Sequence, residues 1–425
     1  MIKKFLTKKI EKYLYDLANQ RLKDKKAFII AVTGSVGKSS SKEAIKVLLN
    51  AFFKNKVFVS HGNMNESVGL PMSILGFDYV PSKIEWPKVL FEAKRKAKNK
   101  QFPEYLVVEM GVEKPGDIKY FTSLAKPNIA LLTSIGPAHL ENLGDIDGVL
   151  KEKIELFKSL PEAGVAIYNN DDQKISEYAP KIKNHTISYG FTKGSTILGK
   201  VIKSERDGVL LEVTNGKLTK QIKTTLIGNH MILALLSAMA IAEALGLDFD
   251  KSLKSLKEFK PLHGRMNLIE GIKDSLIIDD SYNANPNSVL AALETLRTFN
   301  TSGRRVVILG NMNELGKFEE SAHVIVARAA GTFADAMIFI GPNSQKMKEA
   351  AEREVVKRNR KPNIVTFETP SRATLSLDEL IEENDLILVK ASQNRMRFEK
   401  IVEVIMKNPG QAKDLLARQD KRWRR

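Results

Sequence analysis

TGSVGKSS, residues 33–40, lies between two segments of opposite character. The apolar run AFIIAV (27–32) before it is typical of a buried strand, and the amphipathic stretch from about Lys38 to Phe53 after it is typical of a helix. Glycines at such a turn let the backbone approach phosphate groups, which the N–H groups of the loop and of the helix N-terminus can cradle. In this loop Lys38 would reach the β- and γ-phosphates of a nucleotide, and Ser39 would bind Mg²⁺. The alternative is an ordinary turn, because position 32 is Val where the full P-loop pattern has Gly.

Further apolar runs predict the fold class. YLVVEMG (105–111) and NIALLTSIG (128–136) are strands typical of a parallel sheet, and the polar-alternating residues 195–227 predict a small antiparallel meander. Later strands alternate with helical stretches, which predicts a second, doubly wound parallel sheet. The predicted later strands are 275–280, 304–310, 335–341, 363–368 and 385–392.

The predicted architecture is therefore α/β. A central P-loop parallel-sheet ATPase domain with the small meander precedes a C-terminal Rossmann-like doubly wound domain. We place the boundary at EFKPLHGRM (258–266), where Pro and Gly mark a change of composition. The predicted parts are a basic amphipathic helix (1–26), the ATP-binding domain (27–260) and the C-terminal domain (261–425).

Composition narrows the functional class. The 425 residues contain no cysteine, which excludes disulfides, thiolate zinc sites and cysteine nucleophiles and fits a reducing cytoplasm. No apolar run approaches the ~20 residues of a membrane span, and the N-terminus lacks the apolar core of a signal peptide. We therefore expect a cytoplasmic protein, working as a monomer.

The net charge of +17 favours polyanionic partners. No nucleic-acid motif accompanies it, so nucleic acid is not an expected partner. Residues 1–26 hold nine basic and three acidic residues, and residues 94–100 read KRKAKNK. The simplest interpretation is that both are solvated helix faces. The alternative is attraction of a substrate diphosphate or an anionic membrane surface by the lysines of the first helix, namely Lys3, Lys4, Lys8, Lys9 and Lys12.

Polar residues follow several predicted strands. Glu109 ends one strand, and His139 follows the next, in GPAHLE. The cluster DDSYNANP (279–286) leaves a strand of the second sheet. Ligands of parallel sheets collect at the carboxyl ends of strands, so Glu109 and His139 could hold Mg²⁺ beside the phosphate loop. Taken singly, each has a plainer interpretation as a surface charge, a packed histidine or an Asp/Asn turn.

These motifs carry a family resemblance. TGSVGKSS, EMG, GPAHLE, KEKIELF, GRM and DDSYNANP occur here in the same order as in the Mur ligases. The sequence most resembles the branch that adds D-alanyl-D-alanine to the UDP-N-acetylmuramoyl tripeptide (MurF-type). NMNELG (311–316) with His323, and VKAS (389–392), resemble that branch in its third domain.

The resemblance implies roles for individual residues. Lys38, Lys153 and His139 would be catalytic, with Lys153 carbamylated so that its carbamate acts as a carboxylate near the metal. Two Mg²⁺ ions would be held by Ser39, Glu109, His139 and Lys153. ATP would be bound by the loop residues Thr33, Gly34, Ser35, Val36, Gly37, Lys38, Ser39 and Ser40, and by Arg265, Asp280, Tyr282, Asn283 and Asn285. The other substrates would be bound by Asn65, Lys390 and Ser392.

The implied reaction joins a small-molecule carboxylate to an amine. Transfer of the γ-phosphoryl group of ATP would make an acyl phosphate, which the amine then attacks. The expected product is a muramoyl-peptide cell-wall precursor extended by a D-alanyl-D-alanine-like dipeptide or an amino acid. Alternatives are a ligase of the same fold for a carboxylate without UDP, and a noncatalytic ATP-binding partner subunit.

The sequence departs from the family at several positions. Only 32 residues precede Thr33, where the branch has a UDP-binding domain, so we expect uridine to contribute little to binding. Met231 and Ala234 stand where the family has asparagines near adenine, and Asn311 stands for an aspartate. Gln393 stands for the arginine of the K-G-S-R motif, which the family uses for the incoming dipeptide.

Overall fold

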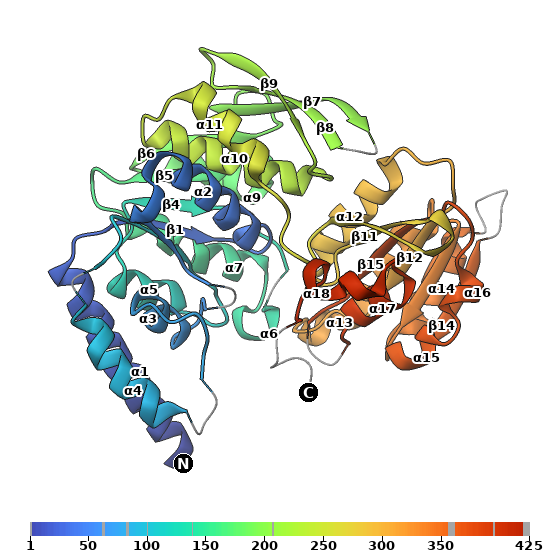
Figure 1. Cartoon of the computed structure of the whole chain (residues 1–425), viewed down its shortest axis with the longest axis horizontal. Coiled ribbons are helices and arrows are strands. Elements are labelled where there is room, and N and C mark those ends of the chain that lie inside the picture. Colours follow the sequence, from blue (N-terminus) through green and yellow to red (C-terminus); the bar gives the residue numbers. More distant parts are fainter. Residues whose placement is uncertain are drawn as a thin grey trace. The chain divides into compact units, whose positions relative to one another are not determined.

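The computed structural model describes residues 2–61, 64–81, 85–99, 101–137, 139–205, 208–355, 362–393 and 396–419, with side chains from Thr7 onward. The chain divides into two compact units, each built on its own sheet (Figure 1). Unit 1 comprises Met1–Lys200, Leu211–Ile222 and Leu233–Phe259, and unit 2 comprises Val201–Leu210, Lys223–Ile232 and Lys260–Arg425. The predicted α/β class is confirmed.

The first sheet has nine strands in the described part of the chain, in the order β2-β3-β1-β4-β5-β6-β7-β8-β9. The strands are β1 (Phe28–Thr33), β2 (Val57–Val59), β3 (Tyr105–Glu109), β4 (Ile129–Leu132), β5 (Val165–Asn169), β6 (His185–Gly190), β7 (Ile197–Glu205), β8 (Gly208–Thr214) and β9 (Thr219–Thr224). The pairings from β2 to β7 are all parallel, so β1, β3 and β4 end at one edge.

The helices of this half of the chain begin with a long one and include several short ones. They are α1 (Ile2–Asp24), α2 (Lys38–Phe53), α3 (Gly69–Ile74), α4 (Trp86–Ala97), α5 (Asp117–Leu124), α6 (Leu140–Leu143), α7 (Ile146–Lys153), α8 (Glu155–Lys158), α9 (Gln173–Tyr178), α10 (Asn229–Ala244) and α11 (Phe249–Ser255). Short 3₁₀ turns lie at Lys54–Lys56, Ala179–Lys181 and Leu256–Glu258.

Helix α1 packs on unit 1 beside α3, α4 and α5. Leu14 and Ala18 are fully buried in the same core as the inner residues of α4. The guanidinium of Arg21 donates to the carbonyls of Ile74 (2.9 Å) and Gln101 (3.2 Å), which fixes the end of α1 to two further segments. Helix α1 therefore packs by its apolar stripe on the rest of unit 1.

Unit 2 is built on a six-stranded sheet in the order β10-β11-β15-β12-β13-β14. Its strands are β10 (Asn267–Glu270), β11 (Leu276–Asp279), β12 (Arg305–Leu309), β13 (Ala336–Ile340), β14 (Asn363–Phe367) and β15 (Leu386–Lys390). Its helices are α12 (Pro286–Thr298), α13 (Glu319–Gly331), α14 (Ser344–Val355), α15 (Pro370–Thr374), α16 (Leu377–Leu380), α17 (Glu399–Ile405) and α18 (Ala412–Leu415), with 3₁₀ turns at Ile272–Asp274, Gly316–Phe318 and Pro409–Gln411. All its strands pair in parallel except β10, which is antiparallel to β11.

Several features differ from the sequence-based expectation. Strands β5 (VAIYN, 165–169) and β6 (HTISYG, 185–190) are not among the predicted strands; β5 is a short apolar run, whereas β6 mixes apolar and polar side chains without a clear period. Residues 146–158 form two short helices, α7 and α8, rather than one. The antiparallel β10 was also not predicted. No helix among the described residues is long and apolar enough to cross a membrane.

Candidate functional site

The phosphate loop is held by the segment that follows β4. The backbone N–H of Val36 donates to Ser134 Oγ (2.8 Å), and that of Ser35 donates to the Ser134 carbonyl (2.9 Å). A Cβ at Gly34 would lie 1.9 Å from Thr133 Oγ1, and Gly37 has φ 87° at the start of α2. Both glycines are therefore required by the geometry, one for close approach and one for its backbone conformation.

Two lysines converge on this loop. Lys38 Nζ donates to the Gly34 carbonyl (2.7 Å), and Lys153 Nζ donates to the same oxygen (3.2 Å). Lys153 is only 2% exposed. Its burial, and then the charge of Lys38, lower the pKa of Lys153 well below its usual value, against the opposing effects of Glu152 and Glu109. Lys153 thus lies against the phosphate loop.

The neighbour of Lys153 explains how it is positioned. Both carboxylate oxygens of Glu152 accept backbone N–H groups at the start of α5, one from Gly116 (2.9 Å) and one from Ile118 (2.9 Å). Glu152 is buried, and its negative charge suits a helix N-terminus. This contact anchors the last turn of α7, and with it Lys153, to α5.

Glu109 is the carboxylate of the site. It is 3% exposed, and its Oε2 accepts from Ser39 Oγ (3.1 Å) and lies 3.2 Å from Lys42 Nζ. Its Oε1 accepts from Asn65 Nδ2 (3.0 Å), and its backbone N–H donates to Ser60 Oγ (3.2 Å). The hydroxyl and carboxylate expected to share a metal ion are thus adjacent.

The structure adds Lys42 and Ser60, which the sequence interpretation missed. Lys42 lies three residues after Ser39 on α2, so the two side chains share a face of that helix. That spacing was a usable signal for Lys42. Ser60 follows the short edge strand β2, and no local motif marks it.

Other residues of the predicted set have different surroundings. The buried Thr33 hydroxyl donates to the Met110 carbonyl (2.8 Å) and so ties β1 to the segment after β3. Ser40 is buried in the first turn of α2. His139 is half-buried directly before α6, in a left-handed conformation (φ 53°). Within the described ranges, no group of three or more His, Cys, Asp or Glu side chains is suited to a metal ion.

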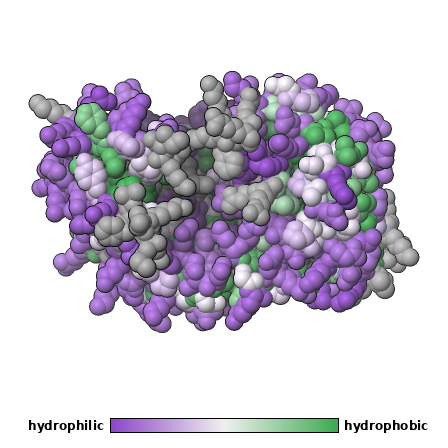
Figure 2. Space-filling model, turned by 90° about the horizontal axis from the view of Figure 1, so that it is seen from below, coloured by the Kyte–Doolittle hydropathy of each residue, from purple (hydrophilic) through white to green (hydrophobic). Residues whose placement is uncertain are grey.

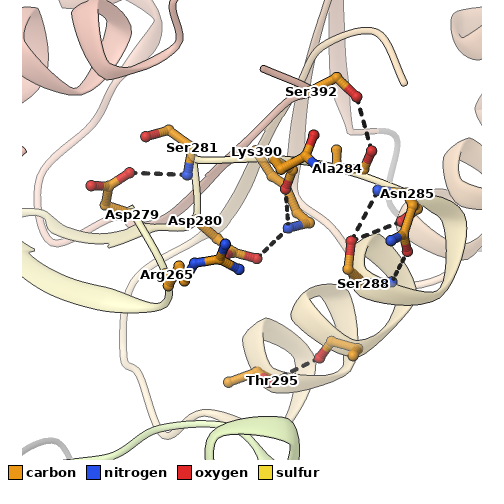
Figure 3. Close-up of polar contacts among 12 residues, drawn as sticks. Arg265, Asp279, Asp280, Ser281, Ala284, Asn285, Ser288, Thr295, Lys390 and Ser392 are labelled. Carbon is orange, nitrogen blue, oxygen red and sulfur yellow. Dashed lines mark hydrogen bonds and ion pairs between the residues drawn. The ribbon is translucent and has the colours of Figure 1, made fainter. Parts of the chain in front are cut away.

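The predicted residues of the second sheet form a separate cluster in unit 2 (Figure 3). Lys390 Nζ lies 2.5 Å from Asp280 Oδ2 and donates to the Asn283 carbonyl (2.8 Å). Burial lowers the pKa of Lys390, an effect that the Asp280 charge opposes. The Arg265 guanidinium lies over the Tyr282 ring, 4.5 Å from its centroid. Residues distant in the sequence are thus brought together at the carboxyl ends of β11 and β15.

The remaining members of that cluster are engaged in local structure. Asn285 caps α12 by accepting from the Ser288 N–H (2.9 Å). The Ser392 hydroxyl donates to the Ala284 carbonyl (2.9 Å), and Asn283 Oδ1 accepts from the Gln393 N–H (3.2 Å). These bonds fix the turn after β11 against the turn after β15.

His230 belongs to the same unit. Its Nδ1 is buried and has no hydrogen-bond partner among the described residues. Burial lowers the pKa of His230 to about 4, so the ring is neutral at neutral pH. An unpaired ring nitrogen beside Asp280, Lys390 and Arg265 suits a polar group of a nucleotide.

The phosphate loop by itself fits the phosphates of a nucleotide and a metal ion. The loop with Lys38 supplies N–H and ammonium donors for phosphates. Ser39 Oγ and Glu109 Oε2, 3.1 Å apart, are oxygen donors of the type that Mg²⁺ prefers. The cluster in unit 2 combines an ion pair, an aromatic ring and the unpaired His230 nitrogen, which suit a polar ligand.

Comparison with known families gives matches over both halves of the chain. Residues 32–242 match the Mur ligase middle domain, and residues 264–393 match the Mur ligase glutamate ligase domain. The match to the middle domain includes Lys38, Glu109 and Lys153, and the match to the second domain includes Asp280 and Lys390.

Characterised relatives are similar over most of their length. The UDP-N-acetylmuramoyl-tripeptide–D-alanyl-D-alanine ligase of Escherichia coli is 30% identical over 76% of this chain and 67% of its own length. The ligase of the same name from Bacillus subtilis is 27% identical over 93% of this chain and 79% of its own. The crystal structure of MurF ligase from Thermotoga maritima in complex with ADP is similar, with TM-score 0.77 and 25% identity over 93% of this chain and 83% of that one.

Proposed function

Because the chain belongs to the Mur ligase family of ATP-dependent, ADP-forming ligases, we propose that it extends a muramoyl-peptide precursor of the cell wall by a D-alanyl-D-alanine-like dipeptide or an amino acid. The substrates are two small molecules, a carboxylate and an amine. The proposal includes a monomeric enzyme that acts in the cytoplasm without nucleic acid.

The observation that carries the proposal is the convergence of Lys38, Ser39, Glu109 and Lys153 at one edge of the first sheet. A carboxylate is a poor electrophile, so its phosphorylation must precede amide formation. Lys38, which contacts the Gly34 carbonyl, would reach the phosphates of ATP and stabilise the charge that develops during phosphoryl transfer. The loop N–H groups would orient those phosphates.

Mg²⁺ would be held by Ser39, Glu109, His139 and the carbamate of Lys153. When bound, it would neutralise part of the negative charge of the phosphates. Glu109 is suited to this role because Asn65, Lys42 and Ser39 fix both of its oxygens. Asn65 therefore supports the metal-binding carboxylate as well as being a candidate for contact with the muramoyl substrate.

Carbamylation of Lys153 is supported by its surroundings. Only a neutral amine reacts with carbon dioxide, and burial beside Lys38 favours the neutral form of Lys153. The carbamate would be a buried anion whose charge both Lys38 and a metal ion can balance.

Substrate identity in the proposal rests on the names of the relatives, which are ligases of a UDP-linked tripeptide and D-alanyl-D-alanine. In unit 2 we assign ATP to Arg265, Asp280, Tyr282, Asn283 and Asn285. Lys390 and Ser392 are the candidates for binding the incoming amine substrate.

The test is a phosphate-release assay with ATP and MgCl₂, pairing muramoyl peptides, with and without UDP, with candidate amines. Product should form only when both substrates are present. Lys38→Ala should reduce turnover at least a thousandfold, about 4 kcal/mol of transition-state stabilisation. Lys46→Ala is the matched control, since Lys46 is an exposed residue of the same helix. Turnover by Lys38→Ala equal to that of the control would overturn the proposal.

A further inference from the structure

The outer face of α4 carries an exposed aromatic residue. Phe91 is 75% exposed, although its helix buries Val89 and Ala93 in the core of unit 1. At 100° per residue Phe91 lies in the middle of the solvent-facing side. It therefore contributes little to packing and is available for contact with a partner.

Basic residues surround Phe91 at helical spacing. Lys88 and Lys94 lie three residues to either side, and Arg95 and Lys98 follow at positions i+4 and i+7. All four are exposed. Residues 86–98 hold five basic residues and one acidic residue. Exposed basic side chains around an aromatic ring suit contact with anionic lipid headgroups, which attract Lys and Arg and favour aromatic rings at the interface.

Helix α1 lies beside α4 (Figure 1) and adds further exposed basic and aromatic side chains. Its buried stripe faces the core that α4 also covers, and its solvent side carries Lys8, Lys12 and the 38% exposed Tyr13. Together residues 1–26 and 86–98 supply ten of the seventeen excess positive charges of the chain. Elsewhere the surface seen in Figure 2 is mostly hydrophilic, with hydrophobic residues in small groups.

We propose that the outer faces of α4 and α1 form a docking surface for an anionic lipid bilayer. Phe91 and Tyr13 enter the headgroup region, where aromatic rings are favoured. The surrounding lysines and Arg95 attract the lipid phosphates, each contributing near the surface. A second copy of the chain is a poor occupant of this face, because it would bring the same positive charge. Stacking platforms for nucleic acid interleave several aromatic residues with basic ones, whereas α4 exposes a single ring.

The experiment is sedimentation of the full chain with vesicles of phosphatidylcholine, with or without one-third phosphatidylglycerol. Binding should require the anionic lipid and should fall at least about tenfold when NaCl rises from about 0.05 to 0.5 M. Phe91→Ser should weaken binding about tenfold at low salt, because one aromatic side chain no longer enters the bilayer. Leu375→Ser is its control, since Leu375 is 85% exposed and lies in unit 2.

Charge is tested by the double variant Lys94→Glu with Arg95→Glu. It should abolish binding, whereas Lys257→Glu with Lys260→Glu, at two exposed positions outside α1 and α4, changes the net charge equally and should leave most binding intact. If both double variants lose vesicle binding equally, net charge alone explains the binding and the proposal is overturned. Equal binding to neutral vesicles, or preference for a short DNA duplex over anionic vesicles, would also overturn it. These measurements do not use ligase activity, so their outcome is independent of the proposed reaction.

Discussion

Lys153 is a buried amine that faces a second lysine across the Gly34 carbonyl. Lys153→Ala should lower turnover at least a hundredfold, because the carbamate that would complete the metal site is lost. Adding acetate or formate should restore part of the activity, since a small carboxylate can enter the space left by the side chain. The measurement is the initial rate with increasing acetate.

Lys151→Ala provides the control for that experiment. Lys151 belongs to the same helix but is exposed, so its loss should leave the rate near that of the wild type. Rescue by acetate should be absent in Lys151→Ala. If neutral acetamide rescues Lys153→Ala as well as acetate does, filling of a cavity explains the effect and the carbamate is excluded.

Asp279 is a fully buried carboxyl group whose pKa burial raises to about 6. A raised pKa means that folding takes up a proton, so this contribution to stability is present below about pH 4 and is lost as the pH rises through 6. Asp279→Asn replaces the carboxyl group by an amide, which does not titrate. The free energy of unfolding of the variant, relative to wild type, should therefore increase between pH 4 and pH 7 by on the order of 2 kcal/mol. Urea denaturation at several pH values measures this; a constant difference would contradict the assignment.

The carboxylate of Glu152 joins helix α7 to the start of α5. Glu152→Ala removes the acceptor of the Gly116 and Ile118 N–H groups. Leaving these donors without partners should lower the free energy of unfolding by about 2–4 kcal/mol. Because Lys153 follows directly, turnover should fall as well.

Glu155→Ala is the comparison for that variant. Glu155 begins α8 and pairs with Lys158 at the surface, so its loss should cost less than about 1 kcal/mol. Urea denaturation of both variants gives the difference. Similar stabilities of the two variants would mean that the cap on α5 is not what holds α7.

Binding of nucleotide should be visible in the stability of the whole molecule. Mg-ADP at about a hundred times its dissociation constant should stabilise the wild-type protein by about 2.7 kcal/mol, because only the folded chain has the phosphate loop. Lys38→Ala should show a much smaller increase in Tm at the same concentration. Equal increases in both proteins would mean that the nucleotide binds elsewhere.

Much of this architecture was predictable because local patterns and tertiary structure agree. The P-loop turn, helix α2 and the strands β3, β11, β12 and β13 have fully apolar or sharply bounded sequences, and each was predicted within a few residues. The edge strand β2 and the mixed-polarity β6 were not, since their stability comes from pairing with neighbours rather than from their own pattern.

The residues of the candidate site also divide into those that a local sequence pattern predicts and those that it does not. Residues in motifs, such as Lys38 and Glu109, could be found because the spacing of each motif has a local cause. The contacts of Asn65, Ser60 and Lys42 with Glu109 join segments more than forty residues apart and depend on the order of strands in the sheet. The two short motifs after β11 and β15 could be named from sequence, but their meeting through Lys390 and Asp280 required the parallel pairing of those strands.

The pairing of Lys42 with Glu109 has a consequence for the order in which ligands arrive. The negative charge of this carboxylate is already balanced inside the protein, and Lys38 lies nearby on the same helix. A divalent ion arriving alone would meet no surplus of negative charge, because Lys42 and Lys38 balance Glu109 and the proposed carbamate, whereas one carried by nucleotide phosphates brings its own counter-charge. Titration calorimetry should therefore detect saturable binding of Mg²⁺ only when ADP is present. The occupancy of the metal site would then follow the concentration of the nucleotide and not the concentration of free Mg²⁺.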